Sequence, residues 1–282
     1  MSFEDRDVVR LGTPRWSGRS ADAKEPASPP LFTYLLDVDD DLAEELDIRM
    51  RFAARQLATA RVLEAETGEC ELESWFATVG RGPGLLILDG LIAVDTRITN
   101  RTVTELLGSG DLLQPLSRHV DDLIERTASW RALCPCRFAL LDADFADRVL
   151  PWPQIGHALL RRTERRMEDL GVMRAISCQP RLEVRLVLFL WHLAARWGRV
   201  ESSGIRLTLP LTHRLLGQLV AAERPSISHA LGRLAHAGLV TGTAGDWHLH
   251  GSVETHLQSL IEGTVRLTPA SDAHRSSHGR FA

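Results

Sequence analysis

One short stretch of the chain concentrates side chains suited to hydrogen bonding with nucleic acid. Arg224, Ser226, Ser228, His229 and Arg233 all lie between residues 224 and 233. An arginine can donate two hydrogen bonds to a guanine edge, and hydroxyl groups at the start of a helix can hold a phosphate. These residue types at this spacing predict base and phosphate contacts to a DNA duplex.

An apolar repeat in the same stretch predicts how those side chains are positioned. Ile227, Leu231 and Leu234 are spaced i, i+4 and i+7, so they share one face of a helix and should turn the polar residues outward. We expect this helix to start near Pro225, which is tolerated in a first turn, and to stop at Gly238. The polar residues would then be presented to a major groove.

The flanking residues predict a second helix and a hairpin. Thr212 is a suitable cap for a short helix that extends to residue 220, and residues 221–223 form a tight turn. Two short strands within residues 239–249 surround a glycine-containing turn. Short helix, turn, longer helix and hairpin make a winged helix-turn-helix. Within it, the further candidates for DNA contacts are Thr212, His213 and Gln218.

The charge distribution fits this prediction. Residues 205–251 contain four arginines and two acidic residues, which gives this segment a net charge of +2. Because the whole chain has a net charge of −4, the rest of the chain carries −6. An isolated helix of this composition would more simply be a solvated surface, but the neighbouring helix and hairpin favour DNA binding. The alternative is a sensor or scaffold protein whose winged helix contacts other proteins.

Composition and motifs argue against other classes of protein. The 282 residues, 44% hydrophobic and 25% charged, suffice for two domains. The sequence has no G-x-S-x-G, P-loop or H-E-x-x-H motif, so we expect no enzyme. The four cysteines have neither disulfide-framework nor zinc spacing, and we expect ordinary buried thiols without a metal: Cys70, Cys134, Cys136 and Cys178.

Neither the amino terminus nor any apolar run indicates a membrane protein. No stretch approaches the roughly 20 apolar residues that span a bilayer, and the start of the chain is acidic and polar. We therefore expect a cytoplasmic protein without membrane contact.

The amino-terminal half predicts an antiparallel β structure followed by helix. Residues 42–60 have helical spacing, and short apolar runs broken by glycine fill residues 61–141. Two of these runs, 85–88 and 91–94, flank Asp89-Gly90, which predicts a hairpin. Farther on, a mixed apolar and arginine stripe on one helix face suits a seam between two chains: Ile155, Leu159, Arg162, Arg166, Leu170 and Met173.

The order of these parts resembles the Crp/Fnr superfamily over about residues 42–251. The resemblance is most specific in LTHRLLGQLV, residues 211–220, and RPSISHAL, residues 224–231. It implies an α+β fold with an antiparallel β-roll of jelly-roll type, similar to cyclic-nucleotide-binding domains. The implied divisions are a flexible tail at 1–30, the β-roll at 31–148, a dimerisation helix at 149–179, the winged helix-turn-helix at 180–267 and a tail at 268–282.

The resemblance also implies a function. Its members are transcriptional regulators that bind a palindromic operator in double-stranded DNA as a homodimer, with RNA polymerase and a small-molecule effector as further partners left open here. Arg224 matches the base-reading arginine of the family, and Ser226 matches its phosphate-binding hydroxyl. Pro225 replaces the glutamate that commonly follows the arginine, which puts the usual operator sequence in doubt.

The cyclic-nucleotide cassette of the family is half present. Its Gly-Glu pair reads Gln114-Pro115 here, and its Arg-Ser/Thr pair reads Arg126-Thr127. A ribose hydroxyl without its carboxylate partner costs about 1–3 kcal/mol, so we expect no control by cyclic AMP. Arg126 and Thr127 remain candidates for holding an anionic effector. Iron–sulfur sensing needs clustered amino-terminal cysteines, which residues 1–69 lack, and we expect no cofactor.

Overall fold

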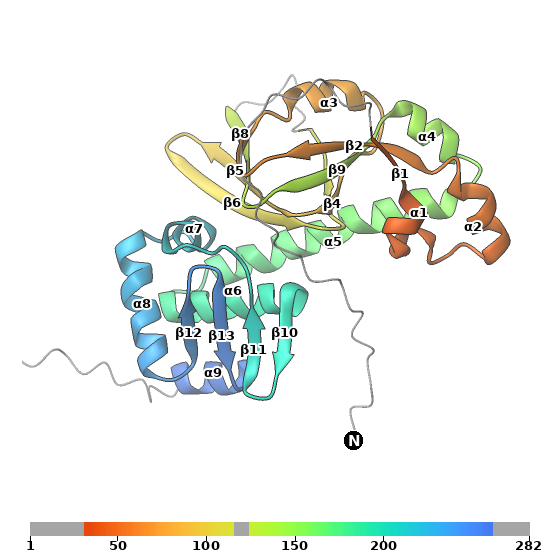
Figure 1. The fold of residues 1–282 in the computed structure, drawn as a ribbon. Coiled ribbons are helices and arrows are strands. Elements are labelled where there is room, and N and C mark those ends of the chain that lie inside the picture. The colour runs from red at the N-terminus through yellow and green to blue at the C-terminus, as the bar shows by residue number, and fades with distance from the viewer. Residues whose placement is uncertain (1–30, 116–123, 262–282) are drawn as a thin grey trace, which may run out of the picture. The chain divides into compact units, whose positions relative to one another are not determined.

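The computed structural model describes residues 31–115 and 124–261 (Figure 1). The tails expected at 1–30 and 268–282 lie outside these residues. The chain divides into two compact units, residues 1–170 and 171–282. Helix α5 (Pro153–Ser177) runs unbroken across this division, and Gly171 is the first residue of the second unit.

Two antiparallel sheets form the first unit, as predicted. Their strand orders are β1-β2-β9-β4-β7 and β3-β8-β5-β6. The strands are β1 (Phe32–Tyr34), β2 (Thr59–Ala65), β3 (Gly68–Cys70), β4 (Gly84–Asp89), β5 (Leu91–Ile98), β6 (Arg101–Gly108), β7 (Leu112–Leu113), β8 (Arg126–Ala132) and β9 (Cys136–Leu141). The helices are α1 (Leu35–Val38), the 3-10 helix η1 (Asp40–Ala43), α2 (Ile48–Arg55), α3 (Glu73–Val79), α4 (Ala143–Val149) and the first part of α5.

Strand β4 shows how the five-stranded sheet is buried on both faces. Leu85 and Ile87 join the core between the two sheets, together with Phe138 of β9. Leu86, on the alternate side of the strand, packs with Phe145 of α4 in a second core beneath the helices. A strand that is covered on both faces needs a continuous apolar run, which β4 has.

The expected hairpin at Asp89-Gly90 is wrong. Strand β4 pairs with β9 and β7, whereas β5 pairs with β6 and β8, so the chain crosses from one sheet to the other at Gly90. Gly90 has φ +102°, and a Cβ there would lie 2.5 Å from the Sγ atom of Cys136. The dipeptide does make a turn, but the apolar strands on either side of it pair with different strands, in two different sheets.

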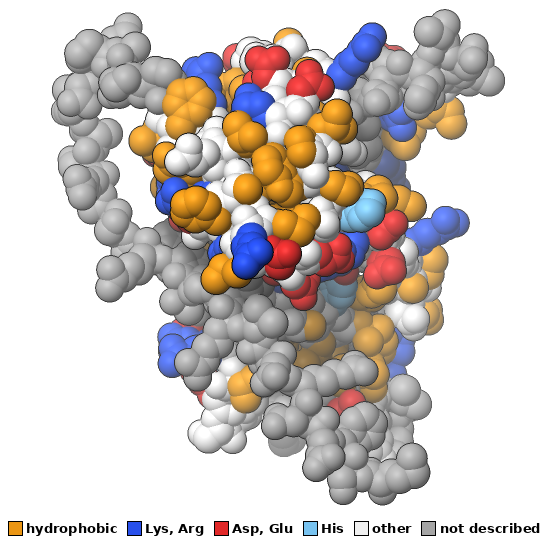
Figure 2. Space-filling model, turned by 90° about the vertical axis from the view of Figure 1, so that its right-hand side faces the viewer, with side chains coloured by type: hydrophobic (Ala, Val, Ile, Leu, Met, Phe, Trp, Pro, Cys, Tyr) orange, Lys and Arg blue, Asp and Glu red, His pale blue; other side chains and the backbone are white. Residues whose placement is uncertain are grey.

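The helix expected over residues 42–60 is shorter and interrupted. Asp47 starts α2 by accepting hydrogen bonds from the backbone N–H groups of Arg49 and Met50, at 2.9 and 2.8 Å. The helix ends at Arg55, and residues 59–65 are strand β2. Ile48 and Phe52 lie one turn apart on α2 and are more than 80% exposed. Figure 2, seen from the side of α1, α2 and α4, shows hydrophobic side chains gathered there.

Residues 155–166 of the mixed apolar and arginine stripe on α5 face their own unit, so the predicted chain–chain seam is wrong for this part of the stripe. Ile155 and Leu159 are buried in the core beneath the five-stranded sheet. Arg166 donates two hydrogen bonds of 2.8 Å to Glu105 of β6. Arg162 is only 6% exposed. The stripe therefore attaches the helix to the β-roll.

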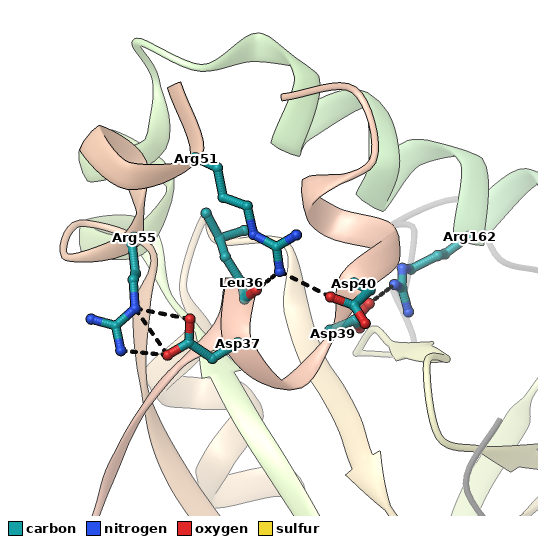
Figure 3. Close-up of polar contacts among 7 residues, drawn as sticks. All are labelled: Leu36, Asp37, Asp39, Asp40, Arg51, Arg55 and Arg162. Atoms are coloured by element: carbon teal, nitrogen blue, oxygen red, sulfur yellow. Dashed lines mark hydrogen bonds and ion pairs between the residues drawn. The ribbon is translucent and has the colours of Figure 1, made fainter. Parts of the chain in front are cut away.

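Arg162 neutralises a buried carboxylate near the start of the described chain. Its Nη2 atom donates to Asp39 Oδ1 at 2.5 Å, and its Nη1 atom donates to the Gly110 carbonyl. Burial raises the pKa of Asp39, and the Arg162 guanidinium opposes that rise. Figure 3 shows this pair beside Arg51, which donates to Asp40 at 2.9 Å. Arginines from two helices thus hold the segment that carries α1 and η1.

The second unit combines helices with a four-stranded antiparallel sheet of order β10-β11-β13-β12. Its elements are α6 (Leu182–Trp197), β10 (Gly198–Glu201), β11 (Gly204–Leu207), α7 (His213–Leu219), α8 (Arg224–His236), β12 (Val240–Thr243), β13 (Asp246–His250) and α9 (Val253–Ile261). Among the described residues of both units, no helix is both long and apolar enough to span a bilayer.

Candidate nucleic-acid interface

Helix α7 and the turn after it are built by short-range contacts. The Thr212 Oγ1 atom accepts from the N–H of Leu215 at 3.1 Å, which confirms the predicted cap. At the other end, Ala221 has φ +53° and the Ala222 N–H donates to the Gly217 carbonyl at 2.8 Å. A Cβ on Gly217 would lie 2.5 Å from the Ala222 carbonyl oxygen, so the tight turn requires glycine.

Helix α8 has the predicted inward face. Ile227, Leu231 and Leu234 are buried, and Ala230 is buried beside them. Gly238, with φ +69°, ends the helix as expected. The consequence for the opposite side is that Arg224, Ser226, Ser228 and His229 are exposed.

Arg233 does not belong to this exposed group, and the expectation that it points outward is wrong. Its Nε atom donates to Glu183 Oε1 of α6 at 2.7 Å, and its Nη2 atom binds the same oxygen. Although burial opposes the change, backbone hydrogen bonding and Arg233 lower the pKa of Glu183. Arg233 thus joins α8 to α6 within the unit.

The wing has twice the predicted number of strands. The expected hairpin is β12–β13, and Trp247 of β13 is 2% exposed. Strands β10 and β11 extend the sheet on the other side, where only a short connection was expected. The available signal for these two strands was Gly204, at the start of β11. A Cβ at this position would lie 1.9 Å from the Leu249 carbonyl oxygen, so the pairing of β11 with β13 requires glycine there. The wing is therefore anchored by a sheet rather than held by α8 alone.

The two helices and the wing surround one open hollow of about 510 Å³. It is lined by Thr212, His213, Arg214, Arg224, Gly242, Thr243 and Ala244. The start of α7, the first residue of α8 and the wing turn thus converge. Arg214 and the wing-turn residues were not predicted as site residues. The position of Arg214 in the first turn of α7, next to His213, was the signal for it.

Ion pairing separates the four arginines that gave this region its positive charge. Arg206 donates to both carboxylate oxygens of Asp246, at 2.7 and 2.8 Å, and Arg233 is paired with Glu183. Arg214 and Arg224 make no ion pair within the described part of the chain. The two uncompensated guanidinium groups are therefore the two in the hollow.

Two other predicted site residues hold the helices together. His213 Nδ1 and Ser228 Oγ share a hydrogen bond of 2.8 Å, and Ser228 Oγ also donates to the Arg224 carbonyl at 3.2 Å. The His213 ring lies 6.3 Å from the Trp247 ring, centre to centre. These contacts fix α7, α8 and the wing relative to one another. Gln218 is half-buried on α7.

The effector candidates of the first unit lie at the start of strand β8. Arg126 and Thr127 start β8 and pair with Ile98 and Arg97 of β5, and Thr127 is exposed. Gln114, also exposed, donates to the Pro83 carbonyl at 3.4 Å. Residues 116–123, which connect these two parts of the cassette, lie outside the described residues.

A β-roll, a long helix and a winged helix-turn-helix define a class of two-domain transcriptional regulators. Residues 184–250 match the Crp-like helix-turn-helix domain. A relative from Mycobacterium tuberculosis, a CRP-like cAMP-activated global transcriptional regulator, is 28% identical over 162 residues, which cover 55% of this chain and 70% of the relative. Residues 184–250 are thus similar to a Crp-like helix-turn-helix domain, and the chain is similar to a CRP-like transcriptional regulator.

Solved structures have the same fold at low sequence identity. A CooA mutant from Carboxydothermus hydrogenoformans aligns with a TM-score of 0.56 and 15% identity over 82% of this chain and 97% of CooA. The c-di-GMP-responsive regulator CLP of Xanthomonas campestris gives 0.52 and 17%, over 71% of this chain and 98% of CLP. These two confirm the predicted architecture.

Proposed function

We propose that this regulator binds an approximately palindromic DNA operator as a homodimer and reads it with α8. The observation that carries the proposal is the pair of uncompensated arginines, Arg214 and Arg224, in the hollow between the helix-turn-helix and the wing. Arg224 at the start of α8 reads a base, since an arginine there can bind guanine with two hydrogen bonds. Arg214 and Ser226 hold the flanking phosphates.

The same helix that ends the β-roll supplies a surface for the second copy. Leu160, Met167 and Leu170 of α5 are between 45% and 67% exposed, on the sides of the helix that the β-roll does not cover. We place the dimer seam on these residues, of which Leu170 belongs to the stripe predicted from the sequence, and not on Arg162 and Arg166. A twofold dimer with winged helices requires half-sites about 34 Å apart.

The test is a binding titration against operators selected from genomic fragments. Arg224→Ala is expected to weaken specific binding by about 1–3 kcal/mol and to relax preference at one base position. Arg214→Ala should weaken binding to all DNA sequences by a similar factor. It should also reduce the slope of the logarithm of the binding constant against the logarithm of the salt concentration by about one. Arg199→Ala on β10 removes the same charge from an exposed site outside the hollow and serves as the control. Absence of any shift at low salt would favour the protein-binding alternative.

Cyclic AMP is not the effector in this proposal. Gln114-Pro115 stands in place of the Gly-Glu pair, so Pro115 replaces the carboxylate partner of the ribose, and the Gln114 amide donates to the Pro83 carbonyl. We expect millimolar cyclic AMP to leave the melting temperature of the full chain unchanged. A stabilisation of several degrees would contradict this expectation without affecting the proposed DNA contacts.

A further inference from the structure

Two cysteines lie where the chain crosses twice between the sheets of the β-roll. Gly90 leads from β4 to β5, and residues 133–135 lead from β8 to β9. The crossings are joined by a hydrogen bond of 2.8 Å from the Leu133 N–H to the Leu91 carbonyl. Cys134 lies within the second crossing, and Cys136 starts the strand after it. The two thiols are therefore held at one corner by backbone from both sheets.

The thiols interact with each other. Cys136 Sγ lies 3.1 Å from the Cys134 carbonyl and 3.5 Å from the Leu91 carbonyl, and the two thiols are near enough to shift each other's pKa. Cys136 is 1% exposed and Cys134 is 8% exposed, so Cys134 is the more accessible of the two. Both are free thiols in this structure.

We propose that Cys134 and Cys136 are a peroxide-oxidised dithiol, in which Cys134 is the reactive thiol and Cys136 the resolving one. The sequence-based expectation of inert buried thiols rested on the lack of a C-x-x-C spacing. It did not anticipate that a turn would bring the two side chains into contact. The proposal is independent of the proposed DNA contacts.

The electrostatics assign the same order to the two thiols. The hydrogen bond from Cys136 lowers the pKa of Cys134 to about 7, against the opposing effects of burial and of Asp89. Cys134 is therefore the thiol with the larger thiolate fraction at neutral pH, and the thiolate is the form that attacks peroxide. The hydrogen bond to Cys134 and burial raise the pKa of Cys136.

The reaction consumes one peroxide for each pair. The Cys134 thiolate attacks one peroxide oxygen, the O–O bond breaks, and hydroxide leaves and takes up a proton to become water. Cys134 becomes a sulfenic acid. Cys136 sulfur then attacks the Cys134 sulfur, and the S–O bond breaks as the hydroxyl leaves with the thiol proton as a second water. The disulfide replaces only side-chain contacts, because the Leu133–Leu91 backbone bond does not involve either sulfur.

Trypsin makes the test direct, because cleavage after Arg131 and Arg137 releases residues 132–137 with these two cysteines and no others. The full wild-type chain is treated with hydrogen peroxide at neutral pH, alkylated and digested. We expect a peptide that takes up no alkyl group, is lighter by two hydrogen atoms and regains two alkylation sites after dithiothreitol. The Cys178 peptide, from an exposed cysteine, controls for alkylation.

Trapping variants test the assigned order. Peroxide with dimedone should label Cys134 in Cys136→Ser, and should label Cys136 in Cys134→Ser clearly less, because Cys136 is the more buried thiol. A wild-type peptide that keeps both alkylation sites, or that is oxidised to sulfinic acid without a disulfide, would overturn the proposal. The wild-type measurement needs no variant, so poor folding of either serine variant leaves it decisive.

Discussion

Replacing Arg162 with methionine should be among the most destabilising single changes in the first unit. The substitution keeps an unbranched apolar side chain but leaves the Asp39 carboxylate, 12% exposed, without its cation. Removing one partner of a buried ion pair costs about 3–5 kcal/mol. The adjacent Arg161 provides a matched control, since its pair with Glu45 has side chains that are 40% and 45% exposed. Such a surface pair is worth about 0–1 kcal/mol.

The loss caused by Arg162→Met should depend on pH in a defined direction. Burial already raises the pKa of Asp39, and Arg162 is the group that opposes this rise. Without Arg162, Asp39 has a higher pKa in the folded state than in the unfolded state. The free energy of unfolding of the variant therefore falls as pH rises from the unfolded-state pKa of Asp39 to its folded-state pKa. The deficit relative to wild type should therefore shrink as pH is lowered toward 4, provided that both proteins remain folded.

The assay must report on the first unit alone, because a two-unit chain need not unfold in one step. Urea denaturation with hydrogen-exchange readout at β7 and β9 supplies this, and linear extrapolation gives the free energy of unfolding for each variant. Equal losses for Arg162→Met and Arg161→Met would refute the reasoning. So would a loss for Arg162→Met that does not change between neutral and mildly acidic pH.

Two further predictions concern the sheet crossing and the second unit. Gly90→Ala should cost on the order of 1–3 kcal/mol, because it places a methyl group against Cys136 at positive φ. Gly171→Ala, in open space on α5, should instead stabilise the protein by up to about 1 kcal/mol. Equal changes in the free energy of unfolding for Gly90→Ala and Gly171→Ala would show that the close approach at Gly90 has no energetic cost. His256 is buried between the Trp191 Nε1–H, at 3.1 Å, and the His250 carbonyl, and burial lowers its pKa. The free energy of unfolding of the second unit should therefore decrease as pH falls below about 6.5, and His256→Gln should make it less dependent on pH. A wild-type second unit that is equally stable at pH 7 and pH 5 would show that His256 does not cause acid destabilisation.

The helix-turn-helix was predictable because its determinants are local. Ile227, Leu231 and Leu234 are only three or four residues apart in sequence, and at the period of a helix they lie on one buried face. Thr212 caps a helix through the N–H three residues ahead, and Gly238 ends the next one. Each inference concerned a distance that the sequence itself fixes. The outward direction of Arg224 followed from the same periodicity.

Several of the failures involve partners that are distant in sequence. Arg233 lies fifty residues from Glu183, and Arg162 lies 123 residues from Asp39. Helical periodicity places an arginine on a side of its helix, but it does not say which acidic group another element brings there. The Asp-Gly turn failed likewise, since a turn dipeptide fixes the local reversal and not the sheet that the next strand joins. The hollow beside Arg224 needed the wing and two helices to be placed together.

The passage of α5 through the division between the units has a mechanical consequence. The helix has no side chain at Gly171, where the second unit begins, and a glycine inside a helix weakens it by about 1 kcal/mol relative to alanine. On the amino-terminal side, Arg162 and Arg166 attach the helix rigidly to the β-roll. A weakened helical position therefore lies at the division between the units, and a Cβ there would have no atom within 4 Å.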